Sequence, residues 1–183
     1  MKKRNILGIG CLGIVVLLAC IIGGVAVSAS RGSSSGGTTA SGSTAAAPSL
    51  LSLGQTTSVK NWDVTAVATD KPGTDLVWSQ FGNKEVAAGT WYVVQMKLKN
   101  TGNTNFGVNS SDFELKDGSG VTYKTSDKLA AYSYSEFKGG KSISSQVPPG
   151  VEVTYYMVYD INPAATGLTM TFKQDKRPTF KLE

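Results

Sequence analysis

The 183-residue sequence contains no histidine, and its two cysteines, Cys11 and Cys20, both lie in the N-terminal segment. The absence of histidine removes the commonest general base at neutral pH and the commonest ligand of transition metals. The absence of cysteine after Cys20 excludes a disulfide or a zinc–thiolate site from the rest of the chain. We therefore expect no catalytic residues, no metal site and no cofactor, and we expect that the protein is not an enzyme.

Acidic residues are absent before residue 50, whereas Lys2, Lys3, Arg4 and Arg31 all lie there. From Leu50 onward, 14 basic residues stand against 13 acidic ones, so most of the net charge of +5 belongs to the N-terminal segment. A nucleic-acid-binding domain needs a basic face on its folded part. The nearly neutral remainder gives no sign of one, and we expect no nucleic-acid partner.

Residues 6–29 form an uncharged, largely apolar run of 24 residues that follows a basic tail at residues 1–5. A helix of this length would extend about 36 Å, which is enough to cross a hydrocarbon core of about 30 Å. The basic residues before it place the N-terminus in the cytoplasm. We predict a signal anchor that passes once through the cell membrane and leaves the following domain extracytoplasmic.

Two alternatives remain for this segment. Leu17-Leu18-Ala19-Cys20 resembles a lipobox, which makes Cys20 a candidate lipidation site, although the apolar residues after it depart from the usual polar sequel. Cleavage after the small residues Val27-Ser28-Ala29 would instead release a secreted protein. All three possibilities deliver the domain across the membrane and differ only in the tether.

Aromatic residues are absent before Trp62, and residues 31–49 also lack any large aliphatic side chain. Such a segment, rich in Ser, Gly, Thr and Ala, cannot bury enough surface to offset the entropy of ordering. We predict a flexible linker at residues 31–49 and a folded domain at residues 50–183.

Alternation of apolar and polar residues within this domain predicts about seven short strands. The clearest strand spans residues 89–102, where Tyr92, Val94, Met96 and Leu98 share one face and Gln95, Lys97 and Lys99 share the other. The sequence also predicts strands at residues 59–68, 112–116, 121–124, 151–161, 168–173 and 180–182, a turn at 70–74, a weak strand and loop at 75–88, and no helix. Strands that are buried on one face imply two packed sheets. The predicted fold class is therefore all-β, a two-sheet antiparallel sandwich preceded by one transmembrane helix.

The turn Asp117-Gly118-Ser119-Gly120 connects two of these predicted strands. We interpret it as a hairpin turn and not as a calcium loop, because the further oxygen ligands of the known calcium loops are missing.

Several segments of the domain resemble a known family. They are Trp62-Asp63-Val64-Thr65, the strand from Gly89 to Gly102, the hairpin from Ser111 to Tyr123, and Pro149-Gly150 before a strand that ends in Asp160-Ile161. Together they are similar to an immunoglobulin-like domain family of unknown function, found in bacterial exported proteins and lipoproteins and related in fold to a secreted immunoprotective antigen. The resemblance covers residues 50–183. It implies an immunoglobulin-like sandwich outside the membrane, and no catalytic residues are established for the family.

The segment Tyr132-Ser133-Tyr134-Ser135-Glu136-Phe137 mixes tyrosine and serine as binding loops do. Tyr132, Tyr134 and Phe137 are therefore the candidate contact surface. The alternative is that these rings close the open ends of the sandwich, because aromatic residues dominate cores as well as interfaces.

The anchor, the linker and the lack of catalytic motifs lead us to expect a membrane-tethered module that binds a protein or a glycan of the cell envelope. One alternative is a lipoprotein or secreted antigen-like domain with a structural role. Another is an accessory ligand-processing protein that uses Asp or Lys residues gathered by the fold.

Overall fold

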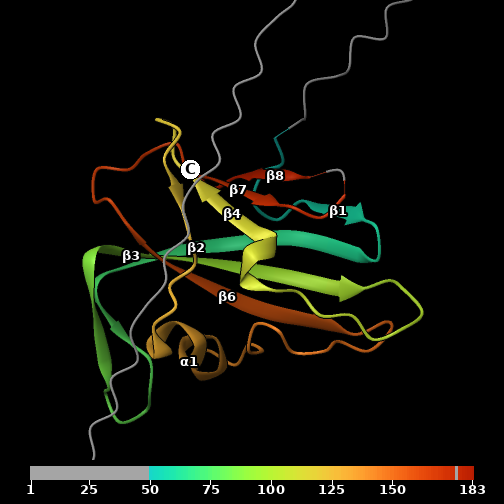
Figure 1. Ribbon diagram of the computed structural model, residues 1–183, viewed down its shortest axis with the longest axis horizontal. Helices are drawn as coiled ribbons and strands as arrows, with labels where there is room; N and C mark the ends of the chain where they lie inside the picture. Colours follow the sequence, from blue (N-terminus) through green and yellow to red (C-terminus); the bar gives the residue numbers. More distant parts are fainter. Residues whose placement is uncertain (1–49, 176) are drawn as a thin grey trace, which may run out of the picture. The chain divides into compact units, whose positions relative to one another are not determined.

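The computed structural model describes residues 50–175 and 177–183, in which eight strands form two four-stranded sheets (Figure 1). One sheet has the strand order β1-β2-β3-β6 and the other the order β5-β4-β7-β8, and all pairs of neighbouring strands are antiparallel. The elements are β1 (Thr56–Val59), β2 (Trp62–Val77), β3 (Lys84–Asn100), β4 (Phe113–Lys116), β5 (Thr122–Tyr123), β6 (Glu152–Ile161), β7 (Thr169–Phe172) and β8 (Thr179–Lys181), with a 3-10 helix η1 (Ser110–Asp112) and an α-helix α1 (Leu129–Phe137). The predicted two-sheet antiparallel sandwich is confirmed, with eight strands in place of about seven. The prediction that the domain has no helix is wrong.

The predicted basic tail, the anchor at residues 6–29 with Cys20, and the linker at residues 31–49 lie outside the described residues. In the described ranges, no helix combines the length and the apolar character needed to cross a membrane. The longest helix there, α1, has nine residues.

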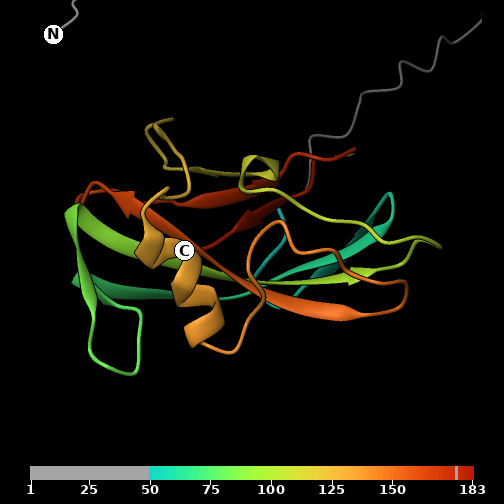
Figure 2. The ribbon, with the colours of Figure 1, turned by 60° about the horizontal axis from the view of Figure 1, so that its bottom comes forward.

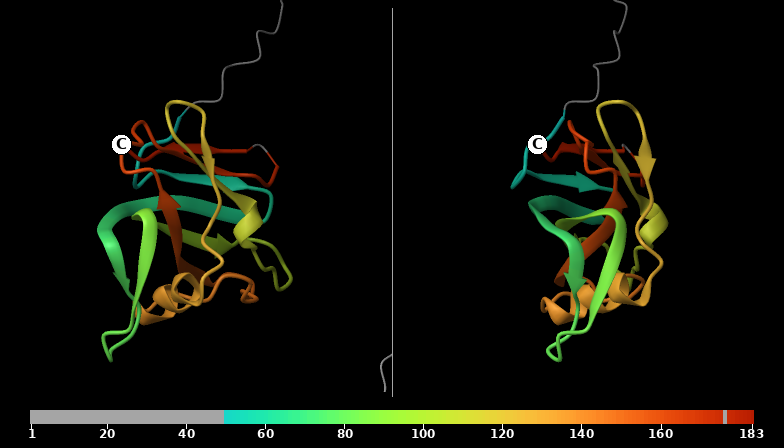
Figure 3. Two further views of the ribbon diagram at one scale, coloured as in Figure 1. Left: turned by 60° about the vertical axis from the view of Figure 1, so that its left-hand side comes forward. Right: turned by 90° about the vertical axis from the view of Figure 1, so that its left-hand side faces the viewer.

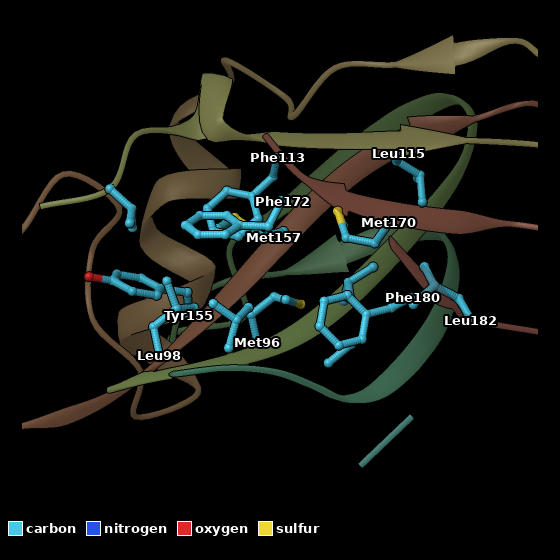
Figure 4. Packing of buried hydrophobic residues seen from close by; sticks show 14 of the residues in the cluster. Met96, Leu98, Phe113, Leu115, Tyr155, Met157, Met170, Phe172, Phe180 and Leu182 are labelled. Carbon is cyan, nitrogen blue, oxygen red and sulfur yellow. The ribbon is translucent and has the colours of Figure 1, made fainter. Parts of the chain in front are cut away.

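Strand β3 lies at the centre of its sheet, between β2 and β6. Its Tyr92, Val94, Met96 and Leu98 are buried on one face, as predicted. Figure 4 shows that this layer packs against side chains of the other sheet, among them Phe113, Leu115, Met170 and Phe172. Each such side chain contributes roughly 1.5–3 kcal/mol through burial, so packing holds the sandwich together without a disulfide.

The opposite face of β3 is exposed to solvent in the second half of the strand and buried in the first half. Gln95 and Lys97 are partly exposed and Lys99 is exposed, as predicted for the second half of the strand. Trp91 and Val93 in the first half are buried, because α1 lies over them on the outer side of this sheet (Figures 2 and 3).

The strand predicted at residues 59–68 is interrupted by a tight turn. Strand β1 ends at Val59 and β2 begins at Trp62. Between them, Lys60 has a φ of 54°, the left-handed conformation that short hairpin turns require.

Residues 70–74 were predicted as a turn but continue strand β2. The pairing of β2 with β3 is irregular between Asp70 and Gly73 and again between Gly73 and Asp75. Strand β1 covers only the beginning of β2, so this stretch lies at the edge of the sheet, where Pro72 can be accommodated without a backbone N–H. Gly73 has a φ of 88°, which bends the strand.

Beyond this bend, the ends of β2 and β3 form a hairpin that leaves the body of the sandwich (Figures 1 and 3). We call residues 75–88 the arm. On β3 the corresponding bend lies at Gly89, where the Asp160 carboxylate accepts hydrogen bonds from the N–H groups of Ala88 (2.7 Å) and Gly89 (2.9 Å). A Cβ atom at Gly89 would overlap the carbonyl oxygen of Ile161, so this close approach requires glycine.

Asn100, the last residue of β3, is a fully buried polar residue with a complete set of partners. Its amide nitrogen donates to the carbonyl oxygens of Thr104 and Val147, both at 2.8 Å, and its side-chain oxygen accepts from the N–H of Gly102 at 2.9 Å. This amide joins two loops to the end of the central strand, a role that the sequence pattern did not reveal.

Candidate functional site

Helix α1 packs on the outer face of the β1-β2-β3-β6 sheet. Its Ala130, Ala131 and Tyr134 form a second apolar cluster with Trp91, Val93 and Val158 of the sheet and Leu76 of the arm. The short helix has no side-chain cap at its N-terminus, so tertiary packing is its main source of stability.

Lys128 connects the start of α1 to the arm. Its Nζ lies 3.0 Å from the Glu85 carboxylate, donates to the carbonyl oxygen of Val86 at 2.9 Å, and lies 5.4 Å from the centroid of the Trp91 ring. The helix and the arm therefore form one continuous part of the surface.

The three candidate contact residues lie on α1 and not on a loop, and they do not form one surface. Tyr132 and Phe137 are exposed at 41% and 43%. Tyr134 is only 4% exposed, because its ring packs at a right angle to that of Tyr156 beneath the helix. Its assignment to the contact surface is therefore wrong. Burial also raises the pKa of its hydroxyl group to about 12.

Ser135, in the same helix, is a buried residue whose role the sequence did not show. Its Oγ donates to the carbonyl oxygen of Lys141 at 2.6 Å and accepts from the N–H of Tyr156 at 3.1 Å. The hydroxyl thus connects α1 to the free edge of β6. Gly140 is packed closely against Ser135, and a Cβ there would come within 2.7 Å of its Oγ.

A pocket lies beside this connection, between α1, the edge of β6 and the segments around residues 110, 125 and 141–143. We call it the edge pocket; its walls include Tyr132, Ile143, Tyr155 and Met157. Its cavity volume is about 20 Å³. In its present form it therefore has room for about one water molecule.

Tyr155 is a notable part of this pocket because its hydroxyl group has no hydrogen-bond partner in the structure. The residue is only 1% exposed, and burial raises the pKa of the hydroxyl to about 12. A buried polar group without a hydrogen-bond partner is uncommon, and its desolvation costs free energy of folding. This raises the question of which molecule occupies the pocket.

A second, wider hollow of about 320 Å³ adjoins the edge pocket, and Ser110 and Thr125 line both. Its other walls come from β4, β5 and the residue that follows β7, and they include Glu114, Lys124 and Lys173. We call the two hollows together the trough. Its residues come from six separate parts of the chain, so their sequence spacing could not bring them to attention.

Three large apolar side chains of the arm are exposed, namely Val77, Phe81 and Val86. Phe81 is the most exposed of them at 83% and lies in the turn of the hairpin. Ser79 holds this turn, because its Oγ accepts from the N–H groups of Phe81 (3.3 Å) and Asn83 (3.1 Å). The phenylalanine ring is thus presented to solvent by an ordered turn.

The segment from Asp117 to Gly120 is a hairpin turn between β4 and β5, as predicted. The Asp117 carboxylate accepts from the Oγ of Ser119, the hydroxyl of Tyr123 and the N–H groups of Ser119 and Val121. These bonds, the Ser119 hydroxyl first, lower the pKa of the carboxyl group. The carboxylate is thus engaged by its own turn.

The sequence of this sandwich domain matches the profile of a known protein family. The profile of DUF4352, a domain of unknown function, matches residues 51–179, which is well over half of the chain. This chain belongs to the DUF4352 family. No curated protein matches the sequence of this DUF4352 protein.

Solved structures support the fold of this DUF4352 domain. The yjhA protein from Bacillus subtilis is similar, with a TM-score of 0.56 and 16% sequence identity over 73% of this chain and 100% of that one. A secreted protein from Mycobacterium tuberculosis, MPT63, is similar with a TM-score of 0.52 and 12% identity over 74% of this chain and 98% of that one. At these identities the likeness shows the fold alone. The predicted resemblance to a family of unknown function, related in fold to a secreted antigen, is confirmed.

Proposed function

We propose that this protein is an extracytoplasmic interaction module, held at the cell envelope by its N-terminal segment, that contacts another envelope protein through the arm and α1. The proposal includes no catalytic step. The observation that carries it is the distribution of exposed apolar side chains in the domain.

The arm and α1 together expose six large apolar residues. In the described part of the chain only four others are exposed to a similar degree, and they are scattered over the N-terminal end, the β4–β5 turn and the start of β6. We call the six residues the apolar end: Val77, Phe81, Val86, Leu129, Tyr132 and Phe137. A concentration of exposed apolar side chains on one part of a domain is typical of an interaction site.

The position of the apolar end fits a tethered module. In Figures 1 and 3 the arm and α1 lie at the side of the domain opposite to the start of the described chain, which is drawn in cyan. A domain tethered through the residues before Leu50 would present this end away from its attachment.

Two of the lysines near the apolar end are already paired within the domain. Lys84 is paired with Asp75 at 2.6 Å, and Lys128 with Glu85 at 3.0 Å, so these lysines are already neutralised within the domain. Phe81 and its neighbours then offer aromatic and aliphatic contacts, which resemble the buried anchors of protein interfaces.

We also infer that the sandwich is immunoglobulin-like. The pairing of β3 with β6 and of β4 with β7 joins strands that are distant in sequence, as strands B and E and strands C and F are joined in the immunoglobulin fold. The chain passes from one sheet to the other between β3 and β4 and returns between β5 and β6.

Residues 6–29 remain the proposed single-pass anchor of this module, with the N-terminus in the cytoplasm. Lipidation at Cys20 or cleavage after Ala29 are the two other ways in which the same domain could be delivered, and all three are compatible with a sandwich that resembles a secreted protein in fold.

Matched serine variants test the contact surface. One full-length variant carries Phe81→Ser, Leu129→Ser and Phe137→Ser, and the control carries Leu53→Ser, Val121→Ser and Val151→Ser at exposed apolar positions elsewhere. Each is added to envelope fractions from the native host, and the retained amount is measured. We expect about a hundredfold loss of affinity for the first variant, since three central interface residues that each contribute roughly 1 kcal/mol together contribute about 3 kcal/mol, and little change for the control. Equal retention of the two variants would refute the apolar end as the contact surface.

A further inference from the structure

We propose that the trough binds a polyanionic chain, a linear polymer whose negative charges are phosphates or carboxylates. The trough lies outside the apolar end except for Tyr132, and the proposal does not depend on the protein contact described above. It assigns a second, anionic ligand to hollows whose walls include lysines and hydroxyl groups.

The first argument is charge. Lys141 lines the edge pocket, and Lys124 and Lys173 line the wider hollow. None of these three lysines forms an ion pair within the described residues, where the paired lysines are 71, 84, 97, 116 and 128. The one carboxylate in the walls, that of Glu114, lies 3.9 Å from the Nζ of Lys116. The trough therefore has an excess of positive charge on a domain that is nearly neutral.

The second argument is the supply of hydroxyl groups. Ser110 and Thr125 lie where the two hollows meet, Ser126 lines the edge pocket, and Ser111 and Thr122 line the wider hollow. Hydroxyl groups donate hydrogen bonds, so they can bind the anionic groups of such a polymer. Lysines provide compact positive charges for the anions.

The third argument is the unpaired hydroxyl of Tyr155. It belongs to a residue that lines the enclosed end of the trough, and it has no partner in the structure. The oxygen is enclosed in the present form of the pocket, so a single water there would be needed to link it to a ligand in the wider hollow.

The shape of the trough suits a flexible polymer better than the surface of a membrane. Its lysines and hydroxyls line a hollow of about 320 Å³ and the adjoining edge pocket of about 20 Å³, between strands, loops and the helix. A flexible polymer can enter the wider hollow, whereas the headgroups of a flat bilayer meet only its rim.

The test compares two double variants with the same change in net charge. Lys124→Gln with Lys173→Gln removes the two lysines of the wider hollow, and Lys99→Gln with Lys181→Gln removes two exposed, unpaired lysines elsewhere. Binding of the full-length protein, in a neutral detergent, is measured with fluorescently labelled inorganic polyphosphate, oligogalacturonate and dextran. We expect the trough variant to lose about five- to tenfold in affinity for an anionic polymer, with a change under about twofold in the control.

A third variant distinguishes the loss of binding groups from a loss of affinity that is caused by misfolding. Glu114→Gln removes the only carboxylate in the walls and should strengthen binding, which misfolding cannot imitate. Preference for polyphosphate would identify phosphate as the recognised group, and preference for oligogalacturonate would identify carboxylate. Equal losses in the two double variants, equal binding of dextran, or binding to phosphatidylglycerol vesicles in place of both anionic polymers would each overturn the proposal.

Discussion

At the scale of single residues, this domain depends on a few polar side chains that each satisfy several backbone groups. Asn100 joins two loops to β3, Ser135 fastens α1 to β6, Asp160 holds the bend at the base of the arm, and Asp117 organises the β4–β5 turn. Loss of such a group leaves its partners without hydrogen bonds, and this cost usually exceeds the value of the bond itself.

Asp117 makes the stability of the domain depend on pH. Its carboxyl pKa is lower in the folded protein than its usual value, so the ionised form stabilises the fold above that usual value, and the contribution is lost as the pH falls through the folded pKa. We expect Asp117→Asn to be clearly less stable than the wild type near pH 6 and the difference to shrink near pH 2. Urea unfolding of the full-length protein at both pH values measures this, with Asp127→Asn, at an exposed aspartate outside the turn, as the control. A difference that stays the same at both pH values would show that the ionised carboxylate contributes no stability.

At the scale of elements, the arm exists because both of its strands bend. On β2 the bend depends on Pro72 and Gly73 at an open edge, and on β3 it depends on Gly89 and the carboxylate of Asp160. These contacts fix the direction in which the arm and Phe81 leave the sandwich.

Gly89 provides the prediction at this scale. Because a Cβ atom there would overlap the Ile161 carbonyl oxygen, Gly89→Ala should destabilise the protein by about 1–3 kcal/mol through steric strain. The neighbouring Ala88→Gly change adds no atom and should cost only about 0.5–1 kcal/mol. Urea unfolding gives the free energies, and hydrogen exchange at the amides of residues 88 and 89 reports on the bend. An alanine variant as stable as the wild type, with unchanged exchange, would contradict this account of the bend.

Individual elements also show what the sequence could predict. The inward face of β3 was predicted correctly because its apolar residues alternate over four positions, Tyr92, Val94, Met96 and Leu98. Helix α1 was missed because nine residues with mixed tyrosine and serine, and without an N-terminal side-chain cap, carry little helical signal of their own. The turn predicted at residues 70–74 was wrong because proline and glycine there bend an edge strand and do not end it.

At the scale of the whole molecule, the sequence predicted the class of fold but did not predict all the residues of the two proposed binding surfaces. Tyr132 and Phe137 were identified by their aromatic character, but Tyr134 between them is buried once the segment is helical. The lysines of the trough are brought to their places by the packing of distant segments. Spacing along the chain carries no record of that packing, so these residues could not be selected in advance.

The central claim for the whole molecule is that the domain lies outside the cell and stays attached to the envelope. The natural chain has no cysteine beyond Cys20, so Lys99→Cys, at an exposed position, places a single thiol on the domain. Intact cells of the native host that produce the full-length variant are treated with a membrane-impermeant thiol reagent, and wild-type cells serve as the control. Membrane fractionation and intact mass follow.

We predict that the Lys99→Cys protein is labelled in intact cells, that the wild type is not, and that the labelled protein is found in the membrane fraction. Full-length mass would identify the signal anchor, added acyl mass on a chain that begins at Cys20 would identify a lipoprotein, and a product that begins near Ser30 would identify a secreted domain. Labelling that occurs only after the cells are lysed would place the domain inside the cell and contradict the account.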